Sequence, residues 1–285
     1  MGKKSYHSPW FIVPACVIFG LFFLIPTITS FYFSLRVWNF DSSTFTGLLN
    51  FKLFLTDSSL SIGIKNTFLY AVLTCILKVV FGFLIALALT GRLKTKGFLR
   101  SVVFFPTLVS TVAVGITFSA LMHPTKGLIN RFLGLIGLSS VDWLGNIDIA
   151  LLSVILTDVW KGLGIATIIY IAGMKSIDTS YYEAAEIDGV TGWQRVRYIT
   201  IPLCLPSINS VIILAFISGM RTFDLIWSMT GGGPGMATDV MASIIYKQYA
   251  AGYWGISTAG NVILLIMIAV LAFPLQKFLL RWEEV

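Results

Sequence analysis

Long apolar runs without charge constrain this chain more than any other feature of its sequence. The first run extends from Trp10 to Leu35 and contains no charged residue. A helix needs about 20 predominantly apolar residues to cross the hydrocarbon core of a bilayer, so this run is long enough to span one. Hydrophobic residues make up 56% of the chain and charged residues only 12%, which excludes an ordinary soluble protein. We therefore expect an integral membrane protein.

Five further apolar runs give the chain a predicted total of six membrane spans. We expect an all-α fold, a polytopic membrane helical bundle with six transmembrane helices and both termini on one side. Residues 1–60 are predicted to hold an N-terminal tail, the first span and an external loop, and residues 61–285 a five-helix transmembrane domain. The later spans are predicted at about 66–90, 101–122, about 149–173, about 207–229, and 256–280.

The distribution of basic residues predicts which side of the membrane the termini occupy. Segments on the side of the N-terminus, which include Lys3 and Lys4, carry more Lys and Arg than the opposite loops do. The short loop 91–100 holds Arg92, Lys94, Lys96 and Arg100 without an acidic residue. By the positive-inside rule, the N- and C-termini are cytoplasmic. This rule also explains the net charge of +7, so we expect no nucleic-acid partner.

The longest polar interval of the second half, residues 180–206, contains helix-capping patterns. Ser180 followed by Glu183 has capping-box spacing and predicts a helix start. Gly189 is the residue best able to adopt the left-handed conformation that ends such a helix. This interval is predicted to lie on the same side of the membrane as the termini.

A second helix is predicted directly after that turn. Thr191 and Gln194 repeat the capping-box spacing, and the helix is expected to reach Ile199 before Pro202 stops it. The resulting helix, turn and helix has two interpretations. It is either an ordered loop that covers the underside of the bundle or a docking surface for another protein.

Charged residues inside the predicted spans form the other informative group. Asp158 and Lys161 are three residues apart, as are Arg221 and Asp224, so each pair is able to share a helix face. One interpretation is two self-neutralising pairs near helix ends. The other is a polar path for a hydroxylated solute, with Trp160, Phe223 and Trp227 as flat apolar surface. Lys78 is expected to snorkel or to pair with another helix.

The sequence lacks the signatures of an enzyme, a metal site or a nucleotide site. No Ser/His/Asp set or paired catalytic carboxylates are apparent, and His7 and His123 lie far apart without a further ligand at useful spacing. The glycine run 231–235 does not match the Walker pattern. We expect no metal and no cofactor on this chain, and if transport is driven by ATP, another chain must bind the nucleotide.

These residues resemble the permease subunits of binding-protein-dependent ABC importers, in the branch that carries maltose, glycerol 3-phosphate and multiple sugars. The family motif is EAA, three residues, Gly, nine residues, and then I-x-L-P. Ile201 is the single departure, at the position of the motif Leu. The resemblance extends from about the second span to the C-terminus. The matching residues are Glu183, Ala184, Ala185, Gly189, Ile199 and Pro202, with Phe223, Asp224 and the run 230–234 typical of the sugar branch.

The resemblance implies a function and a set of partners. A cytoplasmic EAA coupling loop, about residues 178–202, is expected to dock on a separate ATPase subunit. The partners implied are a second homologous permease, two ATPase subunits that bind ATP and Mg, an extracytoplasmic solute-binding protein, a carbohydrate and the lipid bilayer of a prokaryotic cytoplasmic membrane. The coupling residues implied are Glu183, Ala184, Ala185, Asp188, Gly189, Ile199 and Pro202. The solute-pathway residues expected are Trp160, Lys161, Arg221, Thr222, Asp224 and Trp227.

Two other functions remain open at this point. One is an ABC permease for a solute that is not a sugar, such as a polyamine or phosphate. The other is an ion-coupled secondary transporter that uses the embedded charges as a relay. The chain itself is expected to be a transport subunit and not an enzyme.

Overall fold

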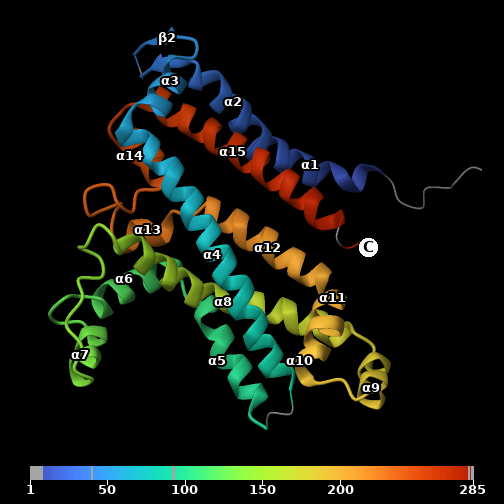
Figure 1. Ribbon diagram of the computed structural model, residues 1–285. Coiled ribbons are helices and arrows are strands. Elements are labelled where there is room, and N and C mark those ends of the chain that lie inside the picture. Colours follow the sequence, from blue (N-terminus) through green and yellow to red (C-terminus); the bar gives the residue numbers. More distant parts are fainter. Residues whose placement is uncertain (1–8, 40, 92–93, 282, 284–285) are drawn as a thin grey trace, which may run out of the picture. The chain divides into compact units, whose positions relative to one another are not determined.

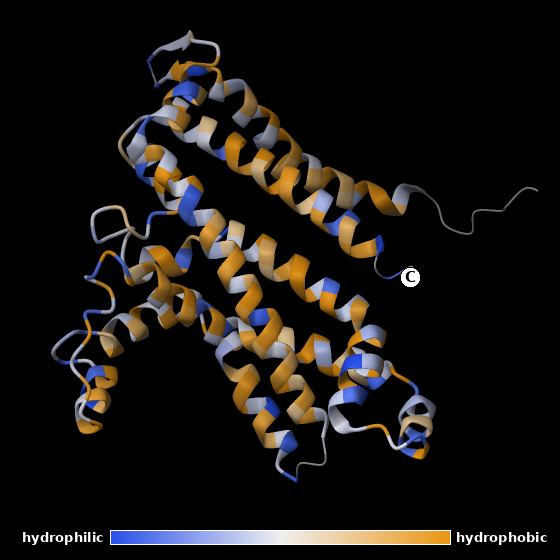
Figure 2. Ribbon diagram, viewed as in Figure 1, coloured by the Kyte–Doolittle hydropathy of each residue, from blue (hydrophilic) through white to orange (hydrophobic). Residues whose placement is uncertain are grey.

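The computed structural model of the chain describes residues 9–39, 41–91, 94–281 and 283. The basic residues Lys3, Lys4 and Arg92 of the orientation argument lie outside this described part. Nearly all of the described chain is helical, and Figure 2 shows that hydrophobic residues dominate the long helices. The chain forms two compact units (Figure 1). Unit 1 comprises Met1–Ser61 and Ile244–Ile266, and unit 2 comprises Ile62–Ser243 and Met267–Val285.

Unit 1 contains the first predicted span and a small cap. The span is one helical stretch over Trp10–Ser34 whose side chains stay exposed, as lipid-facing residues would. Asn50 holds the cap together, because its amide donates to the carbonyls of Ser34 and Arg36 at 2.9 and 2.8 Å. The elements are a 3-10 turn Pro9–Ile12, α1 Val13–Phe19, a π turn Gly20–Leu24, α2 Ile25–Ser34, the antiparallel strands β1 Arg36–Trp38 and β2 Ser43–Phe45, α3 Leu49–Thr56, most of α14 Met241–Ala250, and the first half of α15 Trp254–Arg281.

Unit 2 contains the remaining helices and the largest buried clusters. One cluster joins α4, α8 and α12 around Tyr170, and another joins α4, α12 and the second half of α15 around Phe216. The elements are α4 Ser58–Thr90, α5 Lys96–Leu108, α6 Thr111–Leu121, α7 Leu128–Leu135, α8 Ala150–Ser176, α9 Thr179–Ile187, α10 Gly192–Arg195, a π turn Val196–Thr200, α11 Ile201–Leu203, α12 Leu205–Met220 and α13 Asp224–Met229.

The described structure has four to six candidate membrane spans, a range that includes the predicted six, and two of the predicted spans differ in shape from the prediction. Four described helices are long and apolar enough to cross a membrane, and two bent helix pairs bring the number to six if each pair is one span. The predicted span 101–122 bends by 99° between α5 and α6, because Val109 and Ser110 are extended. The predicted span 207–229 is not one helix either, since α12 ends at Met220 and α13 begins at Asp224.

Two neighbouring side chains of α4 anchor the glycine-rich segment after α13. The Asn66 amide donates to the carbonyls of Ala237 and Asp239 at 3.1 and 2.9 Å. Next to it, the Thr67 hydroxyl accepts the backbone N–H of Met241 at 2.8 Å. Both polar side chains are buried, so they fix the path of the segment between α13 and α14.

Candidate functional site

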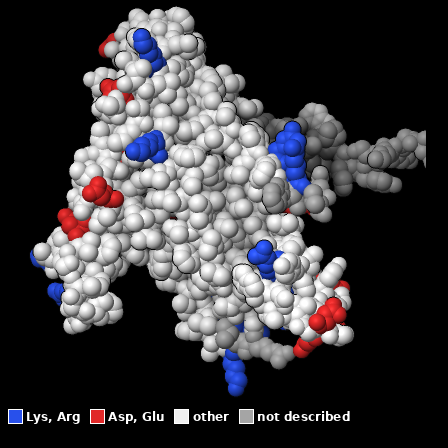
Figure 3. Space-filling view, viewed as in Figure 1, with Lys and Arg blue, Asp and Glu red and all other residues white. Residues whose placement is uncertain are grey.

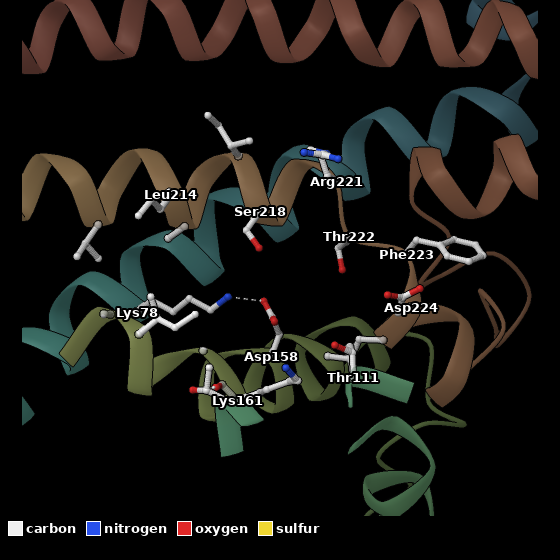
Figure 4. A pocket seen from close by; sticks show the side chains of 18 of the residues that line it. Lys78, Thr111, Asp158, Lys161, Leu214, Ser218, Arg221, Thr222, Phe223 and Asp224 are labelled. Carbon is white, nitrogen blue, oxygen red and sulfur yellow. Dashed lines mark hydrogen bonds and ion pairs between the residues drawn. The ribbon is translucent and has the colours of Figure 1, made fainter. Parts of the chain in front are cut away.

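A cavity of about 600 Å³ lies within unit 2 (Figure 4). This volume is within the range of small-molecule sites in proteins. Its walls come from α4, α5, α6, α8, α12 and α13, so helices far apart in the sequence meet around it. Two helix interruptions border the cavity. One is the break between α5 and α6, through Thr111, and the other is the segment 221–223 between α12 and α13. The polar and charged residues that line it are Lys78, Thr107, Thr111, Asp158, Lys161, Ser218, Arg221, Thr222 and Asp224.

One ion pair crosses this cavity wall between α4 and α8. The Lys78 ammonium donates to Asp158 Oδ2 at 2.7 Å, and the two side chains are only 7% and 21% exposed. The expectation that Lys78 pairs with another helix is confirmed. The interpretation of Asp158 and Lys161 as a self-neutralising pair is wrong, because Asp158 is engaged by Lys78 from the neighbouring helix.

The second self-neutralising pair of that interpretation, Arg221 with Asp224, also does not form. Arg221 lies in the break after α12 and Asp224 begins α13, so the two residues do not share one helix face. In the part of the chain that the structure describes, no ion pair joins them. Figure 4 shows the Arg221 side chain directed away from the Lys78–Asp158 pair, whereas Asp224 points into the open space.

The structure brings four of the six predicted pathway residues to the cavity. Lys161, Arg221, Thr222 and Asp224 line it. The two tryptophans of the prediction are elsewhere: the Trp160 ring packs on Phe118 at 5.1 Å, and the Trp227 ring stacks on Phe223 at 5.7 Å. Of these aromatic rings, only Phe223 reaches the lining.

Sequence reasoning missed several residues of this wall. Lys78 was not expected to line a solute path, although a lysine inside one apolar run and an aspartate inside another are the signal of an inter-helix pair. Thr107, Thr111 and Ser218 gave no signal, since hydroxyl residues are common in membrane helices and often bond to their own backbone.

The polar interval after α8 forms a second candidate site. Helix α9 begins at Thr179, and its N-cap is Asp178, whose carboxylate accepts the backbone N–H of Ser180 at 2.9 Å. The predicted capping box of Ser180 and Glu183 is therefore wrong. Asp178 has the extended backbone of an N-cap, and Ser180 already lies inside the helix. This hydrogen bond lowers the pKa of the exposed Asp178 carboxyl.

Helix α9 ends in the predicted way at Gly189. This residue has φ +69°, the left-handed region that favours glycine. Its N–H donates to the Glu186 carbonyl at 3.2 Å, and the N–H of Val190 donates to the Ala185 carbonyl at 3.0 Å. These two bonds form a Schellman motif, which satisfies the last carbonyls of α9 and reverses the chain.

The second half of the interval follows one prediction and departs from another. The capping box of Thr191 and Gln194 at the start of α10 is confirmed. Pro202 does not stop the helix, which continues through α11 to Leu203 before a bend of 70° at Cys204. The π turn Val196–Thr200 ends two residues before this proline and shifts the helical hydrogen bonds locally, so the missing N–H of Pro202 is tolerated.

Helix α9 and the following segment of α10 and the π turn enclose a shallow groove of about 300 Å³. Ala185 is buried against it, and the Tyr182 hydroxyl lies 3.3 Å from that of Thr200 and ties α9 to the π turn. Acidic side chains gather at α9 (Figure 3): Asp178, Glu183, Glu186 and Asp188 are all exposed. The groove is lined by Tyr181, Ala184, Ala185, Asp188, Val190, Gln194, Tyr198 and Ile199. Three of the predicted coupling residues do not line the groove. Glu183 lies next to the lining residue Ala184, Gly189 forms the turn between α9 and α10, and Pro202 lies in α11.

The fold and these two sites define a class of protein, a multi-pass helical membrane protein with a solute-sized polar cavity. A family model narrows this class. The chain belongs to the family described as binding-protein-dependent transport system inner membrane component, whose model matches residues 78–283. The members of this family are transport subunits and not enzymes.

Individual proteins similar to this chain agree with this family. The chain is 32% identical to the trehalose/maltose transport system permease protein MalF of Thermococcus litoralis, over 90% of this chain and 88% of that one. It is 29% identical to the multiple sugar-binding transport system permease protein MsmF of Streptococcus mutans, over 99% of both chains. It is also 29% identical to the sn-glycerol-3-phosphate transport system permease protein UgpA of Agrobacterium fabrum, over 96% of this chain and 93% of the relative.

A solved structure has the same fold. It is the crystal structure of a bacterial ABC transporter involved in the import of the acidic polysaccharide alginate, and one of its chains superposes with a TM-score of 0.84 at 23% identity, over 95% of this chain and 94% of that chain. The predicted all-helical membrane fold is thereby confirmed.

Proposed function

We propose that this chain is the membrane-spanning subunit of an ATP-driven importer that moves an oligosaccharide or related carbohydrate across the cytoplasmic membrane of a prokaryote. The observation that carries the proposal is the match to the binding-protein-dependent family over residues 78–283, together with similarity over nearly the whole chain to sugar permeases. The cavity supports it, because hydroxyl and charged groups next to apolar side chains are suited to a polyhydroxylated solute.

The interval from α9 to α11 is proposed to be the coupling element on the cytoplasmic side. The groove between α9 and the π turn gives a partner helix or loop a shaped surface, and Ala184 and Ala185 leave room for close approach. The basic segment at the start of α5, with Lys94 and Lys96 exposed, supports a cytoplasmic position for this side and for both termini.

The proposal assigns the chemistry of ATP hydrolysis to other chains. Two ATPase subunits would bind ATP and Mg, a second homologous permease would complete the pathway, and an extracytoplasmic binding protein would deliver the solute. In this scheme Glu183, Ala184, Ala185, Asp188, Gly189, Ile199 and Pro202 form or support the ATPase contact. Lys161, Arg221, Thr222 and Asp224 line the solute path, with Trp160 and Trp227 next to it.

Purification of the intact complex tests this function. We expect this chain to copurify with an ATPase and a second permease, and we expect the binding protein loaded with a carbohydrate to stimulate ATP hydrolysis. Replacing Glu183 by Ala together with Gly189 by Val should abolish uptake without loss of the chain from the membrane. Glu186→Ala is the matched control, since it removes an equal charge from the same helix. Uptake by the isolated chain without any ATPase would instead support an ion-coupled transporter.

A phosphorylated polyol is the second candidate solute. Similarity to a glycerol 3-phosphate permease favours it. Lys161 and Arg221 also line the cavity, and neither is paired with the single remaining acid, Asp224, in the described part of the chain. Stimulation of the ATPase by sn-glycerol 3-phosphate, and not by neutral disaccharides, would select this candidate.

A further inference from the structure

Helix α7 and the residues that follow it carry hydrophobic side chains that the described part of the chain leaves exposed. Figure 2 shows the hydrophobic colouring of this helix, which lies outside every predicted span. A group of large apolar side chains exposed outside a span marks an interaction site. The five side chains, each between 56% and 84% exposed, are Leu128, Phe132, Leu135, Ile136 and Leu138.

The exposed side chains of α7 form one stripe. Because successive residues of a helix are about 100° apart, Leu128, Phe132 and Leu135 share a face. On the adjacent face, Ile129 packs against a buried cluster of unit 2. Arg131 is exposed on the other side of the stripe. The helix is therefore amphipathic, with an apolar stripe between its packing face and a basic edge.

Hydrogen bonds at both ends of α7 fix the position of this stripe. The Asn130 amide donates to the carbonyls of Pro124 before α7 and Val141 after it, at 3.0 and 2.8 Å, and this side chain is only 6% exposed. Gly137, with φ +79°, ends α7 in a second Schellman motif, in which the Leu138 N–H donates to a carbonyl of the last turn at 2.9 Å. The stripe therefore belongs to an ordered element and not to a loose loop.

Helix α7 begins where α6 ends. A Cβ atom on Gly127, the N-cap of α7, would collide with the carbonyl oxygens of Leu121 and His123, so the two helix ends are in close contact. Helix α6 is the second half of a bent candidate span and exposes apolar side chains such as Ile116, as a lipid-facing helix does. The stripe therefore lies near the level at which α6 leaves the bilayer. Because α8 crosses the membrane once, this side is opposite to that of α9.

We propose that α7 lies in the surface of the bilayer, with its apolar stripe among the lipid acyl chains and its cations near the phosphates. Short amphipathic helices with basic residues on one face and Leu or Phe on the other occupy this position. Lys126 and Arg131 supply the basic charge, and the stripe itself carries no hydrogen-bonding side chain. A soluble protein is a poorer occupant, because each dissociation would return the stripe to water.

This contact would hold one wall of a second cavity at the membrane surface. His123 and Pro124 line a cavity of about 400 Å³ together with Gly233 and Pro234 of the glycine-rich segment. The Asn130 amide of α7 donates to the carbonyls of both His123 and Pro124, so the wall and the helix are rigidly connected. The bilayer would thus position this cavity through α7.

Spin labels on the two edges of α7 test the lipid contact in the complete transporter, reconstituted in vesicles of phosphatidylethanolamine and phosphatidylglycerol. The background is Cys16→Ser, because Cys16 is the exposed cysteine, whereas Cys75 and Cys204 are buried. Leu135→Cys places the label on the stripe, and Arg131→Cys is the matched control on the basic edge. Collisions with oxygen report acyl chains, and collisions with a polar nickel chelate report water.

We expect the label at position 135 to collide mainly with oxygen, at a depth of about 5–10 Å in the boundary between headgroups and acyl chains. The label at position 131 should collide mainly with the nickel chelate. If Leu135→Cys does not assemble, Leu128→Cys places the label on the same stripe.

Two results would overturn the proposal. Frequent collisions of the stripe label with the nickel chelate would place the stripe in water, as a docking surface for a soluble protein requires. Few collisions with either reagent would mean that protein covers the stripe, such as the second permease. The measurement uses neither solute nor ATP, so a failure of import would contradict the proposed function and leave this inference standing.

Discussion

The turn at Gly189 allows a quantitative test of the coupling element. Its φ of +69° lies in the left-handed region, and a Cβ placed there meets no atom within 4 Å. Gly189→Ala therefore introduces no clash, and its whole effect is the backbone cost of the left-handed conformation. This cost is about 1–2 kcal/mol for an ordinary L-residue, which corresponds to about a 5- to 30-fold drop in the population of the turn.

Hydrogen exchange at Val190 reports that population directly. The Val190 amide is protected by its bond to the Ala185 carbonyl, which exists only while the turn is formed. We expect Gly189→Ala to speed its exchange by about 5- to 30-fold. Gly189→Asn should change it much less, because asparagine tolerates the left-handed region. ATPase stimulation in the intact transporter should follow the same order of glycine, asparagine and alanine.

The outcome that refutes this reasoning is equal exchange at Val190 in the wild type and the alanine variant. Equal exchange would mean that the turn does not require glycine. Altered exchange with unchanged ATPase stimulation would have a different meaning. It would retain the structural argument and remove the proposed role of the turn in coupling.

Three further predictions concern single side chains. Thr191→Ala should destabilise the start of α10 by about 1 kcal/mol, measured as faster exchange of the Gln194 amide, whereas Thr191→Ser should retain the cap. Because the pKa of Asp178 is lowered in the folded protein, its cap is complete above the ordinary carboxyl pKa of about 3.9 and is lost as the pH falls through the lower folded value. The protection of the Ser180 amide against hydrogen exchange should decrease over that pH range. Asp178→Ser should show no such titration. Asn66→Ala should leave the loop carbonyls of Met236, Ala237 and Asp239 without their side-chain donor and make segment 231–239 more sensitive to protease in intact membranes. Equal cleavage rates would contradict its role as an anchor.

The sequence was sufficient to predict where the apolar membrane segments lie and where α9 turns, because both depend on local properties. The length of an apolar run determines whether a helix can cross a bilayer, and the left-handed turn requires a residue such as Gly189. The start of α9 was misplaced since Asp178 and Ser180 are both good caps, and only the backbone shows which one is extended. The breaks at 109–110 and 221–223 were missed because neither contains a proline or glycine that would signal the end of a helix, and the charges Arg221 and Asp224 were interpreted as residues within one span.

The charges inside the spans could not be paired from the sequence. Spacing of three residues made Asp158 and Lys161 plausible partners, but it says nothing about a neighbouring helix. The true partner, Lys78, lies 80 residues away along the chain and meets Asp158 only after α4 and α8 pack. Tertiary packing therefore decides the chemistry of the cavity wall, and two tryptophans predicted for that wall are directed elsewhere by the same packing.

From the two helix interruptions beside the cavity, we infer that hydration of this space contributes to the stability of the fold. At bilayer depth, backbone that leaves the helical pattern is stable only when protein covers it or water hydrates it. The backbone around Thr111 and Thr222 borders the open space, so its hydration depends on the cavity remaining wet. Filling that space with bulky apolar side chains, which usually stabilises a soluble core, is then expected to unravel these segments.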